Sequence, residues 1–579
     1  MSARRAVLVF VVLVGVLGTA VLLAALAMRG PTGSTPSETV LVFNVPERID
    51  EAQPPAGGLF DLVRRDRPTV WDVSHGIRHA AGDPHVVGLV LHIEGIDWGW
   101  AKVAEIRDAI SAFRRTGKPV YAALSGGGER EYLLATSAGT IASPPLAVLQ
   151  LDGLSATALF MRGTLDKVGV TPNFAQAGKY KTAVEEWTRT GLTPPSREAL
   201  QALVDDQHGL LVDSLAAGRG LPRDSVARLI DDGPYDTHEA LAHGLIDTLL
   251  YRSELDSLAT SGPKGRRPTT SLTRYLDRID ESGSGPRVAL VMAVGTIAEG
   301  RSRGGPGEGD VLGAETIIRA LRDVRDRSSI EAVVLRIDSP GGSAQASDQI
   351  WHEVRRCAER KPVVISMSDL AASGGYYIAA AGDTIVAQPS TLTGSIGAFG
   401  GKLNLLGLYH KLGLNVETVS RGKHAEMLSP FRDFTPEEAA RFQGQMDGVY
   451  RTFLGRVAEG RHRSIDAIDS VAQGRVWTGV SASTRGLVDV LGGLDRAFAI
   501  ARERADIAAG TPLTIEVFPH VQRTFFQRML ADMVSEEDDD DSEVFGRVSL
   551  PPVVQAWLAA ATFPSGNPLA LMPWSIEIR

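Results

Sequence analysis

Residues 332–342 read AVVLRIDSPGG, a mostly apolar run that ends in a turn of small residues. The run Ala332–Ile337 predicts a buried β-strand, and Gly341 and Gly342 predict a tight turn at its end. The next segment is predicted to be a helix, because apolar residues recur at helical spacing at Ile350, Val354 and Cys357. A second strand is predicted over Pro362–Met367. Strand, turn, helix and strand form a βαβ unit, so we expect an α/β fold with a mostly parallel sheet.

The chain repeats itself at a shift of about 244 residues. This shift pairs Ile93 with Ile337, Ile141 with Ile385, and Gly169 with Gly413. Further along it drifts to 242, where Asp247 faces Asp489, as loop insertions and deletions produce. A period this long indicates duplication of a whole domain and not an array of short repeats.

The duplication divides the chain into segments. We expect a first repeat over 39–250, a polar linker over 252–286, a second repeat over 287–517 and a C-terminal extension over 518–579. Each repeat is predicted to open with a strand, Thr39–Val45 in the first and Arg287–Ile297 in the second. In the extension, the acidic run Glu536–Asp541 is typical of a solvated segment, and Trp574–Ile578 is predicted to be a terminal strand.

A membrane anchor is predicted at Ala6–Met28, which holds 23 consecutive uncharged residues. A helix of that length crosses a hydrocarbon core of about 30 Å. Arg4 and Arg5 precede it, which favours a cytoplasmic N-terminus and a body on the other side, the periplasmic side of a bacterial inner membrane. The alternative is a cleaved signal peptide ending at Ala25-Leu26-Ala27, but the apolar stretch exceeds the ~7–15 residues usual for such peptides. Both interpretations export the body.

Composition excludes several classes of function. Charged residues make up 22% and hydrophobic residues 44% of the chain, as in globular proteins. The net charge of −9 argues against a nucleic-acid partner, which needs concentrated Lys and Arg. Cys357 is the only cysteine, so neither an intramolecular disulfide nor a cysteine-based zinc site is possible, and we expect it in the core. The sequence contains no Walker loop and no His-Glu-x-x-His motif, so no cofactor or metal is predicted.

The two repeats differ where catalytic chemistry is expected. Ser373, in the small-residue turn Ala371–Gly375, faces Glu129 of the first repeat, and Lys181 faces Ala425 of the second. One copy therefore retains a serine and the other a lysine. This division suggests a hydrolase in which the two copies share one Ser/Lys pair.

The surroundings of Ser373 suit a nucleophile. Its small neighbours let a substrate backbone approach closely, and its place at a predicted helix start supplies free N–H groups. The N–H groups of Gly342 and Gly374 would together stabilise an oxyanion, a contribution of ~2.7–4 kcal/mol per donor. The alternative is an ordinary N-cap serine beside a tight turn without a ligand.

A lysine can act as the base only when it is neutral. The pKa of a free lysine is ~10.4, and burial lowers it by up to ~3–5 units. Lys181 and Lys179 both qualify by spacing, and a solvated surface lysine is the alternative for either. Ser420 and Lys423 match a Ser-x-x-Lys pattern but lack its partner motifs. His410 and His424 are other possible bases, but nothing in the sequence brings them near Ser373.

Several segments together resemble the signal peptide peptidase A family in its long, membrane-anchored, tandem-repeat form. They are Ile337–Ser343, Ala371–Tyr376, Ser390–Gly397, Tyr180–Glu185 and Gly474–Gly479, and the resemblance covers roughly 39–515. It implies two tandem Clp/crotonase-like domains of the ββα-superhelix type.

The resemblance also assigns roles. It implies that Ser373 is the nucleophile and Lys181, in preference to Lys179, the general base. It further implies that Ser395 orients the lysine, and that Gly342 and Gly374 form the oxyanion hole.

By the same resemblance, the expected substrates are remnant signal peptides and the expected assembly is a homotetrameric bowl with the sites inside. Such a chamber would admit extended, largely apolar peptides and exclude folded proteins. The first repeat departs from the pattern, because Glu94–Trp98 replaces the glycine turn and cannot form an oxyanion hole. Two alternatives remain: a crotonase-like acyl-CoA enzyme, against which the export signal argues, and a catalytically inactive membrane-tethered scaffold.

Overall fold

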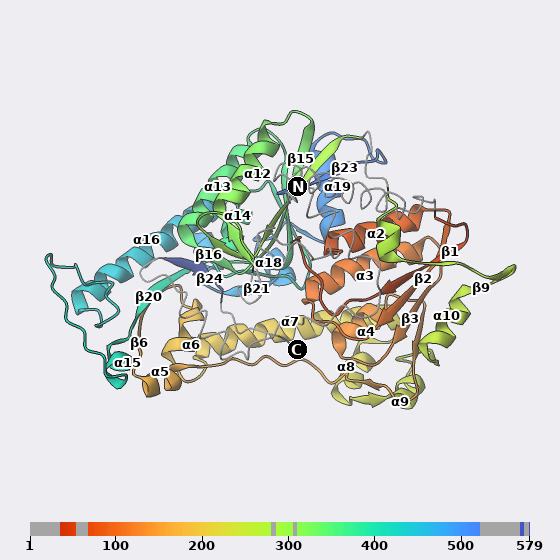
Figure 1. The fold of residues 1–579 in the computed structure, drawn as a ribbon, viewed down its shortest axis with the longest axis horizontal. Coiled ribbons are helices and arrows are strands. Elements are labelled where there is room, and N and C mark those ends of the chain that lie inside the picture. Colours follow the sequence, from red (N-terminus) through yellow and green to blue (C-terminus); the bar gives the residue numbers. More distant parts are fainter. Residues whose placement is uncertain are drawn as a thin grey trace, which may run out of the picture.

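A computed structural model describes residues 35–53, 68–279, 285–304, 310–520, 568–572 and 578 (Figure 1). Within these ranges, no helix combines the length and the apolar character needed to cross a membrane. The predicted anchor Ala6–Met28 and the acidic run Glu536–Asp541 lie outside the described residues. Of the predicted strand Trp574–Ile578, only Ile578 is described.

The second repeat is built on an eight-stranded sheet. Its strands are β12 (Arg287–Val294), β15 (Ile330–Ser339), β17 (Val363–Ala372), β18 (Thr384–Ala387), β19 (Leu392–Gly394), β21 (Val476–Thr478), β22 (Val490–Leu491) and β23 (Thr514–Phe518). β15 and β17 are parallel, with Leu335 opposite Ile365, and α13 (Ala344–Ala358) connects them. The predicted βαβ unit is therefore confirmed.

Helices cover both faces of this sheet. α12 (Ala314–Asp326), α13 and α14 (Gly374–Ala379) pack against one face, and α19 (Leu494–Arg504) packs against the other. This explains why the strands are apolar at successive positions: Val288 faces one core and Ala289 faces the other. Cys357 is fully buried in the first of these cores, as expected, and burial raises the pKa of its thiol to about 11.

The first repeat contains a six-stranded sheet whose neighbouring strands are all parallel. The order is β11 (Thr269–Ser271), β1 (Thr39–Asn44), β2 (Val86–Ile93), β3 (Val120–Leu124), β4 (Thr140–Ser143) and β8 (Thr248–Leu249). α2 (Val70–Gly82), α3 (Trp100–Arg115) and α4 (Glu129–Ala135) pack against it. The succession β2, α3, β3, α4, β4 matches β15, α13, β17, α14, β18, so the duplication in sequence is also a duplication in structure.

The range 252–286, expected to be a polar linker, contains regular elements that belong to the first repeat. They are α10 (Arg252–Thr260), the β9 (Ser261–Gly262) and β10 (Gly265–Arg266) hairpin, β11 and α11 (Leu272–Leu276). β11 is the edge strand beside β1, and Leu255 of α10 and Tyr275 of α11 are buried. These short elements bury few side chains each, which is why the stretch is polar overall.

An arm of the first repeat extends over the second (Figure 1). It contains α5 (Arg162–Val168), β6 (Thr171–Ala177), the 3₁₀ turn η2 (Thr182–Val184) and α6 (Glu185–Thr188). β6 pairs antiparallel with β20 (Ala398–Asn404) of the second repeat. Together they form one side of a third sheet, in the order β14 (Val311–Gly313), β13 (Thr296–Ala298), β16 (Gly341–Ser343), β24 (Leu569–Leu571), β20, β6. Both repeats and the C-terminal extension contribute strands to it.

The long helices of the two repeats also correspond. α7 (Pro194–Arg219) follows the arm of the first repeat, and α16 (Pro436–Gly460) occupies the same place in the second (Figure 1). Each begins with a threonine cap followed by proline, Thr193 in one and Thr435 in the other. The smaller helices are α8 (Arg223–Asp231), α9 (Thr237–Ala242), α15 (Leu406–Lys411), α17 (Ile465–Asp469) and α18 (Gly479–Thr484), and β5 (Val148–Leu149) pairs with β7 (Tyr235–Asp236).

Buried charges fix the orientation of the two repeats. The guanidinium of Arg336 on β15 donates to Glu51 of the first repeat at 2.6 Å, with both side chains fully buried. Asp369 on β17 accepts the backbone N–H of Lys102 at the start of α3, and the Lys102 amine lies 2.8 Å from Asp338. Breaking such a buried pair costs about 3–5 kcal/mol, so the repeats are held in one register.

Candidate active site

Ser373 lies at the junction of β17 and α14, where the sequence predicted a strand-to-helix turn. Its backbone has φ 55° and ψ −113°, a strained conformation for a residue with a side chain. The N–H of Ser373 donates to the Gly394 carbonyl at 2.8 Å, and the residue is fully buried. The strand and the apolar helix thus hold the hydroxyl in one position.

Lys181 reaches this hydroxyl from the arm of the first repeat. Its Nζ lies 2.7 Å from Ser373 Oγ, and 2.9 Å from both the hydroxyl and the carbonyl oxygen of Ser395. Lys179, the alternative by spacing, is exposed and its amine contacts the Tyr180 hydroxyl at 3.2 Å. The structure therefore brings Ser373, Lys181 and Ser395 together, and leaves Lys179 outside.

Backbone contacts with the second repeat position the lysine. The N–H of Tyr180 donates to the Gln473 carbonyl at 2.6 Å. Gly474 has φ 78°, and a Cβ there would lie 2.4 Å from the backbone nitrogen of Lys181. A Cβ on Gly397 would lie 3.1 Å from the Lys181 side chain. A larger residue at either position would crowd Lys181, so these two glycines of the second repeat leave the space that the lysine occupies.

Burial sets the charge of this amine. Lys181 is fully buried, and desolvation lowers the pKa of its amine well below the ordinary value for lysine. A neutral amine has two N–H donors and one lone pair. It can donate to both oxygens of Ser395 and still accept the hydroxyl proton of Ser373. The three contacts of Nζ also suit the three donors of an ammonium, so it is the lowered pKa that favours the neutral form.

Gly342 and Gly374 border the same hydroxyl. Gly374 directly follows Ser373, and a Cβ on Gly374 would lie 3.1 Å from the backbone nitrogen of Gly342. Gly341 and Gly342 have φ values of 98° and 154°, and a Cβ on Gly342 would lie 2.0 Å from the Ile297 carbonyl oxygen. The turn therefore needs both glycines, and it brings the Gly342 amide close to Gly374.

The other candidate groups have different surroundings. Ser420 contacts Glu426, and Lys423 contacts Glu437 at 2.5 Å, so each is paired on the exposed arm of the second repeat. His424 lies 3.8 Å from Glu437. In the part of the chain that the structure describes, no group of three or more His, Cys, Asp or Glu side chains is arranged to hold a metal ion.

Two comparisons identify the family. The model of peptidase family S49 matches residues 112–262 and 355–508, one region in each repeat, and the model of Clp protease matches residues 307–391. The chain is 38% identical over 455 residues to the chloroplastic serine protease SPPA of Arabidopsis thaliana, covering 76% of this chain and 67% of that one. The chain belongs to peptidase family S49. It is a serine peptidase.

Other relatives agree with this assignment. Protease 4 of Salmonella typhi is 32% identical over 519 residues, covering 87% of this chain and 81% of that protein. An Enterococcus faecium protein that carries the name signal peptide peptidase SppA is 31% identical over 222 residues, or 37% of this chain and 63% of that one. The resemblance predicted from the sequence is thereby confirmed.

In this S49 peptidase the first repeat has no serine at the position of Ser373. Glu129 stands there, and its carboxylate accepts the backbone N–H groups of Asp152 at 3.1 Å and Gly153 at 2.9 Å. Burial raises the pKa of this carboxyl, although the backbone N–H groups oppose the shift. In place of the glycine turn, Trp98 donates its indole N–H to the Pro46 carbonyl at 3.0 Å. The first repeat therefore contributes the lysine but no second site of the same kind.

Sequence reasoning missed two contributors to the site. Gly474, which fits against Lys181, belongs to the segment Gly474–Gly479 that carried part of the resemblance, but a lone glycine there predicted no role. Leu569–Leu571 of the extension forms β24 beside Gly342. No signal in the sequence links that apolar segment to a partner more than 200 residues earlier.

Proposed function

We propose that this S49 peptidase cleaves extended peptides with Ser373 as nucleophile and Lys181 as general base. The observation that supports it is the 2.7 Å contact between Lys181 Nζ and Ser373 Oγ in a site where burial lowers the pKa of the amine. Such a lysine is a competent base at neutral pH. Ser395 orients the amine through its hydroxyl and its carbonyl oxygen.

The reaction proceeds in two halves. The Lys181 amine takes the hydroxyl proton as Ser373 Oγ attacks the peptide carbonyl carbon, and the amides of Gly342 and Gly374 stabilise the oxyanion. The Lys181 ammonium then gives its proton to the leaving nitrogen, the C–N bond breaks, and an ester remains on Ser373. Water attacks the ester while Lys181 takes a proton from it, and collapse returns that proton to Ser373. One water is consumed for each bond cut.

The substrates we propose are remnant signal peptides and similar apolar peptides. Apolar side chains surround Lys181, because Ala183 and Val184 follow it and pack against Phe399 of β20. A peptide that reaches Ser373 in extended form contacts this surface, which favours apolar residues. The name of the Enterococcus faecium relative, a signal peptide peptidase, agrees with this substrate class.

We further propose a single-pass anchor at Ala6–Met28 in a bacterial inner membrane, with the peptidase domain outside the cytoplasm. The basic residues Arg4 and Arg5 before the apolar stretch support this orientation. Protease added to intact spheroplasts should then digest the peptidase domain, and alkaline extraction should leave the chain in the membrane fraction.

We propose that four copies form a closed ring. In the repeat register, β6 and β20 correspond to 415–421 and 154–160, and these two segments form no strand of their own. The first is exposed and contains two valines: Val419 is fully exposed, and Leu414, directly before the segment, is 50% exposed. Pairing 415–421 of one copy with 154–160 of the next would repeat the β6–β20 contact head to tail, as closed rings require.

Cleavage of a synthetic leader peptide tests the proposed function. The purified protein should cut the peptide, and a fluorophosphonate probe should label Ser373. Ser373→Ala should abolish both signals without lowering the melting temperature, whereas Ser420→Ala, at an exposed serine, should retain both. Labelling of a different residue, or full cleavage by Ser373→Ala, would reject the assignment.

A further inference from the structure

Residues 568–572 of the C-terminal extension lie beside the glycine turn next to Ser373. β24 lies between β16 and β20 and runs antiparallel to both. Its register places Ala570 opposite Gly342, and the N–H of Met572 donates to the Pro340 carbonyl at 2.9 Å. A Cβ built on Gly341 would lie 2.0 Å from the Ala570 carbonyl oxygen and 2.6 Å from the Gly374 nitrogen. The Ala570 carbonyl therefore points toward the amides proposed for the oxyanion hole.

The side chains of this segment are buried on both sides of the strand. Leu569 and Leu571 pack with Ala183, Val184 and Phe399, the apolar surface beside Lys181. Met572 packs in another cluster that includes Ala372, the residue before Ser373. The segment thus fills the positions that a substrate strand needs, in the manner of β-strand addition.

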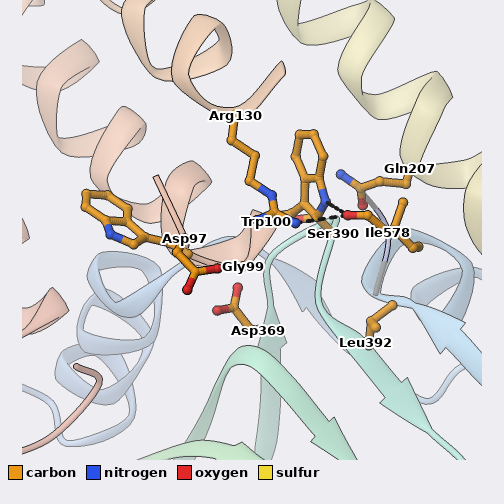
Figure 2. Close-up of a pocket in the computed structure, with 10 residues that line it drawn as sticks. Asp97, Gly99, Trp100, Arg130, Gln207, Asp369, Ser390, Leu392 and Ile578 are labelled. Atoms are coloured by element: carbon orange, nitrogen blue, oxygen red, sulfur yellow. Dashed lines mark hydrogen bonds between the residues drawn. The ribbon is translucent and has the colours of Figure 1, made fainter. Parts of the chain in front are cut away.

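Ile578 binds at a second place, between the two repeats, where its side chain packs in the same cluster as Met572. Its carbonyl oxygen accepts the indole N–H of Trp100 at 3.2 Å and a guanidinium N–H of Arg130 at 3.0 Å (Figure 2). Arg130 also lies over the Trp100 ring, 5.4 Å from its centroid. The three groups line a cavity of about 240 Å³ that also includes Gln207, and Ile578 itself is buried.

The two binding places are related by the duplication. At the shift of 244 residues, Trp98 beside this cavity aligns with Gly342, and Arg130 aligns with Gly374. The strand contacts agree as well. Ile578 pairs antiparallel with Ala156, which aligns with Gly400 of the second repeat. Leu569 pairs antiparallel with Phe399, the residue before Gly400. Arg130 therefore places a carbonyl-binding donor at the position of Gly374, and Trp100, two residues after Trp98, places a second one nearby. They are side chains of Trp100 and Arg130 instead of backbone amides, and no nucleophile accompanies them.

We propose that this cavity, bounded by Trp100 and Arg130 of the first repeat and by Leu392 of the second, is a peptide-binding site for the chain's own C-terminal segment. By holding Ile578 it retains residues 568–572 beside the glycine turn next to Ser373. The segment then competes with substrate, because an attached competitor acts at an effective concentration in the millimolar range. The regulatory part of this inference rests on the proposed function of Ser373, and the binding part does not.

Hydrogen exchange tests the binding part without peptidase activity. In full-length Ser373→Ala protein, the amides of residues 569–572 should be protected. Adding Arg130→Met, which keeps the stem over Trp100 but removes the donors, should speed their exchange about tenfold or more, as should Trp100→Phe. Arg223→Met, at an exposed arginine of the same repeat, should leave them unchanged. Equal protection in all four proteins would overturn the proposal.

Synthetic peptides separate the two contacts. A Ser373→Ala variant that lacks residues 568–579 should bind a labelled peptide of residues 566–579, measured by fluorescence anisotropy. A peptide of residues 566–573, which lacks Ile578, should bind at least about tenfold more weakly. Equal affinities would refute the anchoring role, and exchange in the full-length variants decides the question if the shortened protein does not fold.

Kinetics test the competition. With Ser373 intact, Arg130→Met should lower KM for a leader peptide several-fold and leave kcat unchanged, while Arg223→Met should behave as wild type. An unchanged KM together with fast exchange at 569–572 would show that the segment binds but does not compete. Inactivity of every variant, with the exchange pattern as expected, would reject the proposed function and leave the binding site standing.

Discussion

The amine nitrogen of Lys181 and the hydroxyl oxygen of Ser373 lie 2.7 Å apart, although 192 residues separate them in the chain. Each comes from a different repeat, and both come from one chain. The contact depends on the antiparallel pairing of β6 with β20, which carries the first repeat's arm to the second repeat. Neither repeat holds the pair by itself: the first repeat supplies the lysine and the second supplies the serine.

The pH dependence of kcat/KM should report the Lys181 amine. Only the neutral amine accepts the serine proton, and burial lowers the pKa of that amine. The rate should therefore rise with pH through this lowered pKa and reach a plateau below the ~10.4 of a free lysine. Lys181→Met should lose about 10²–10⁴-fold in rate across the whole range. Lys179→Met, two positions away and exposed, is the matched control and should keep the wild-type profile.

The same amine should make folding stability depend on pH. Its pKa is lower in the folded than in the unfolded chain, so unfolding takes up a proton between those two values. The cost of burying it is absent above about pH 10.4, grows as the pH falls, and is constant below the folded pKa.

The melting temperature of Lys181→Met relative to wild type should therefore increase as the pH is lowered from 10 toward the folded pKa. Scanning calorimetry of both proteins measures this difference. A difference that is constant over that range would mean that the buried amine stays charged.

The βαβ unit of the second repeat, with its buried helix, could be predicted from the sequence, because its apolar spacing is local. Ser373 could be placed at a strand-to-helix turn for the same reason. The selection of Lys181 over Lys179 could not be made from spacing, because it depends on how the arm turns at Gly178–Lys181. That turn is fixed by the Gln473 carbonyl and by the missing side chain of Gly474, both distant in sequence.

The binding of the C-terminal extension was beyond prediction for a related reason. Strand addition uses backbone N–H and C=O groups, which every residue carries, so Leu569–Leu571 has no distinctive sequence pattern.

The segment 252–286 was predicted to be a linker but is part of the first repeat. Its polar composition predicted a linker, but isolated buried residues such as Leu255 and Tyr275 attach it to the first repeat.

Gly474→Ala should inactivate the enzyme by displacing Lys181. The new Cβ would lie 2.4 Å from the Lys181 backbone nitrogen, so one of the two loops must move. A shift of about 1 Å at a reacting group costs about 10²-fold in rate, and the crowding costs about 1–3 kcal/mol of unfolding free energy. Gly444→Ala is the control, since its Cβ on α16 meets nothing within 4 Å and should raise stability by about 0.5–1 kcal/mol. Steady-state kinetics and urea unfolding measure both effects, and wild-type kcat in Gly474→Ala would contradict this account.

Ser395→Ala should weaken catalysis by letting the Lys181 amine take more than one orientation. It removes one of the two Ser395 contacts to Lys181 and retains the carbonyl at 2.9 Å. We expect kcat to fall about tenfold or more with KM nearly unchanged, because the lysine no longer has a single orientation. Ser395→Thr retains the hydroxyl and should recover part of the rate, whereas a purely structural role would leave both variants equally impaired. A pH profile that shifts only in Ser395→Ala would mark the hydroxyl as a positioning group for the amine.

Assembly should depend on the exposed segment 415–421. Light scattering after gel filtration should give four copies for the wild type, and Val419→Asp should give monomers, because a carboxylate cannot be buried against 154–160 of the next copy. Leu258→Asp introduces the same charge at another exposed apolar residue, a 50% exposed leucine on α10 outside both segments, and should leave the assembly intact. Since one chain supplies both Lys181 and Ser373, the Val419→Asp monomer should still cleave a short leader peptide. It should also digest unfolded casein faster than wild type, because no ring restricts access. A wild-type monomer, or a Val419→Asp variant that still assembles, would contradict the proposed head-to-tail pairing.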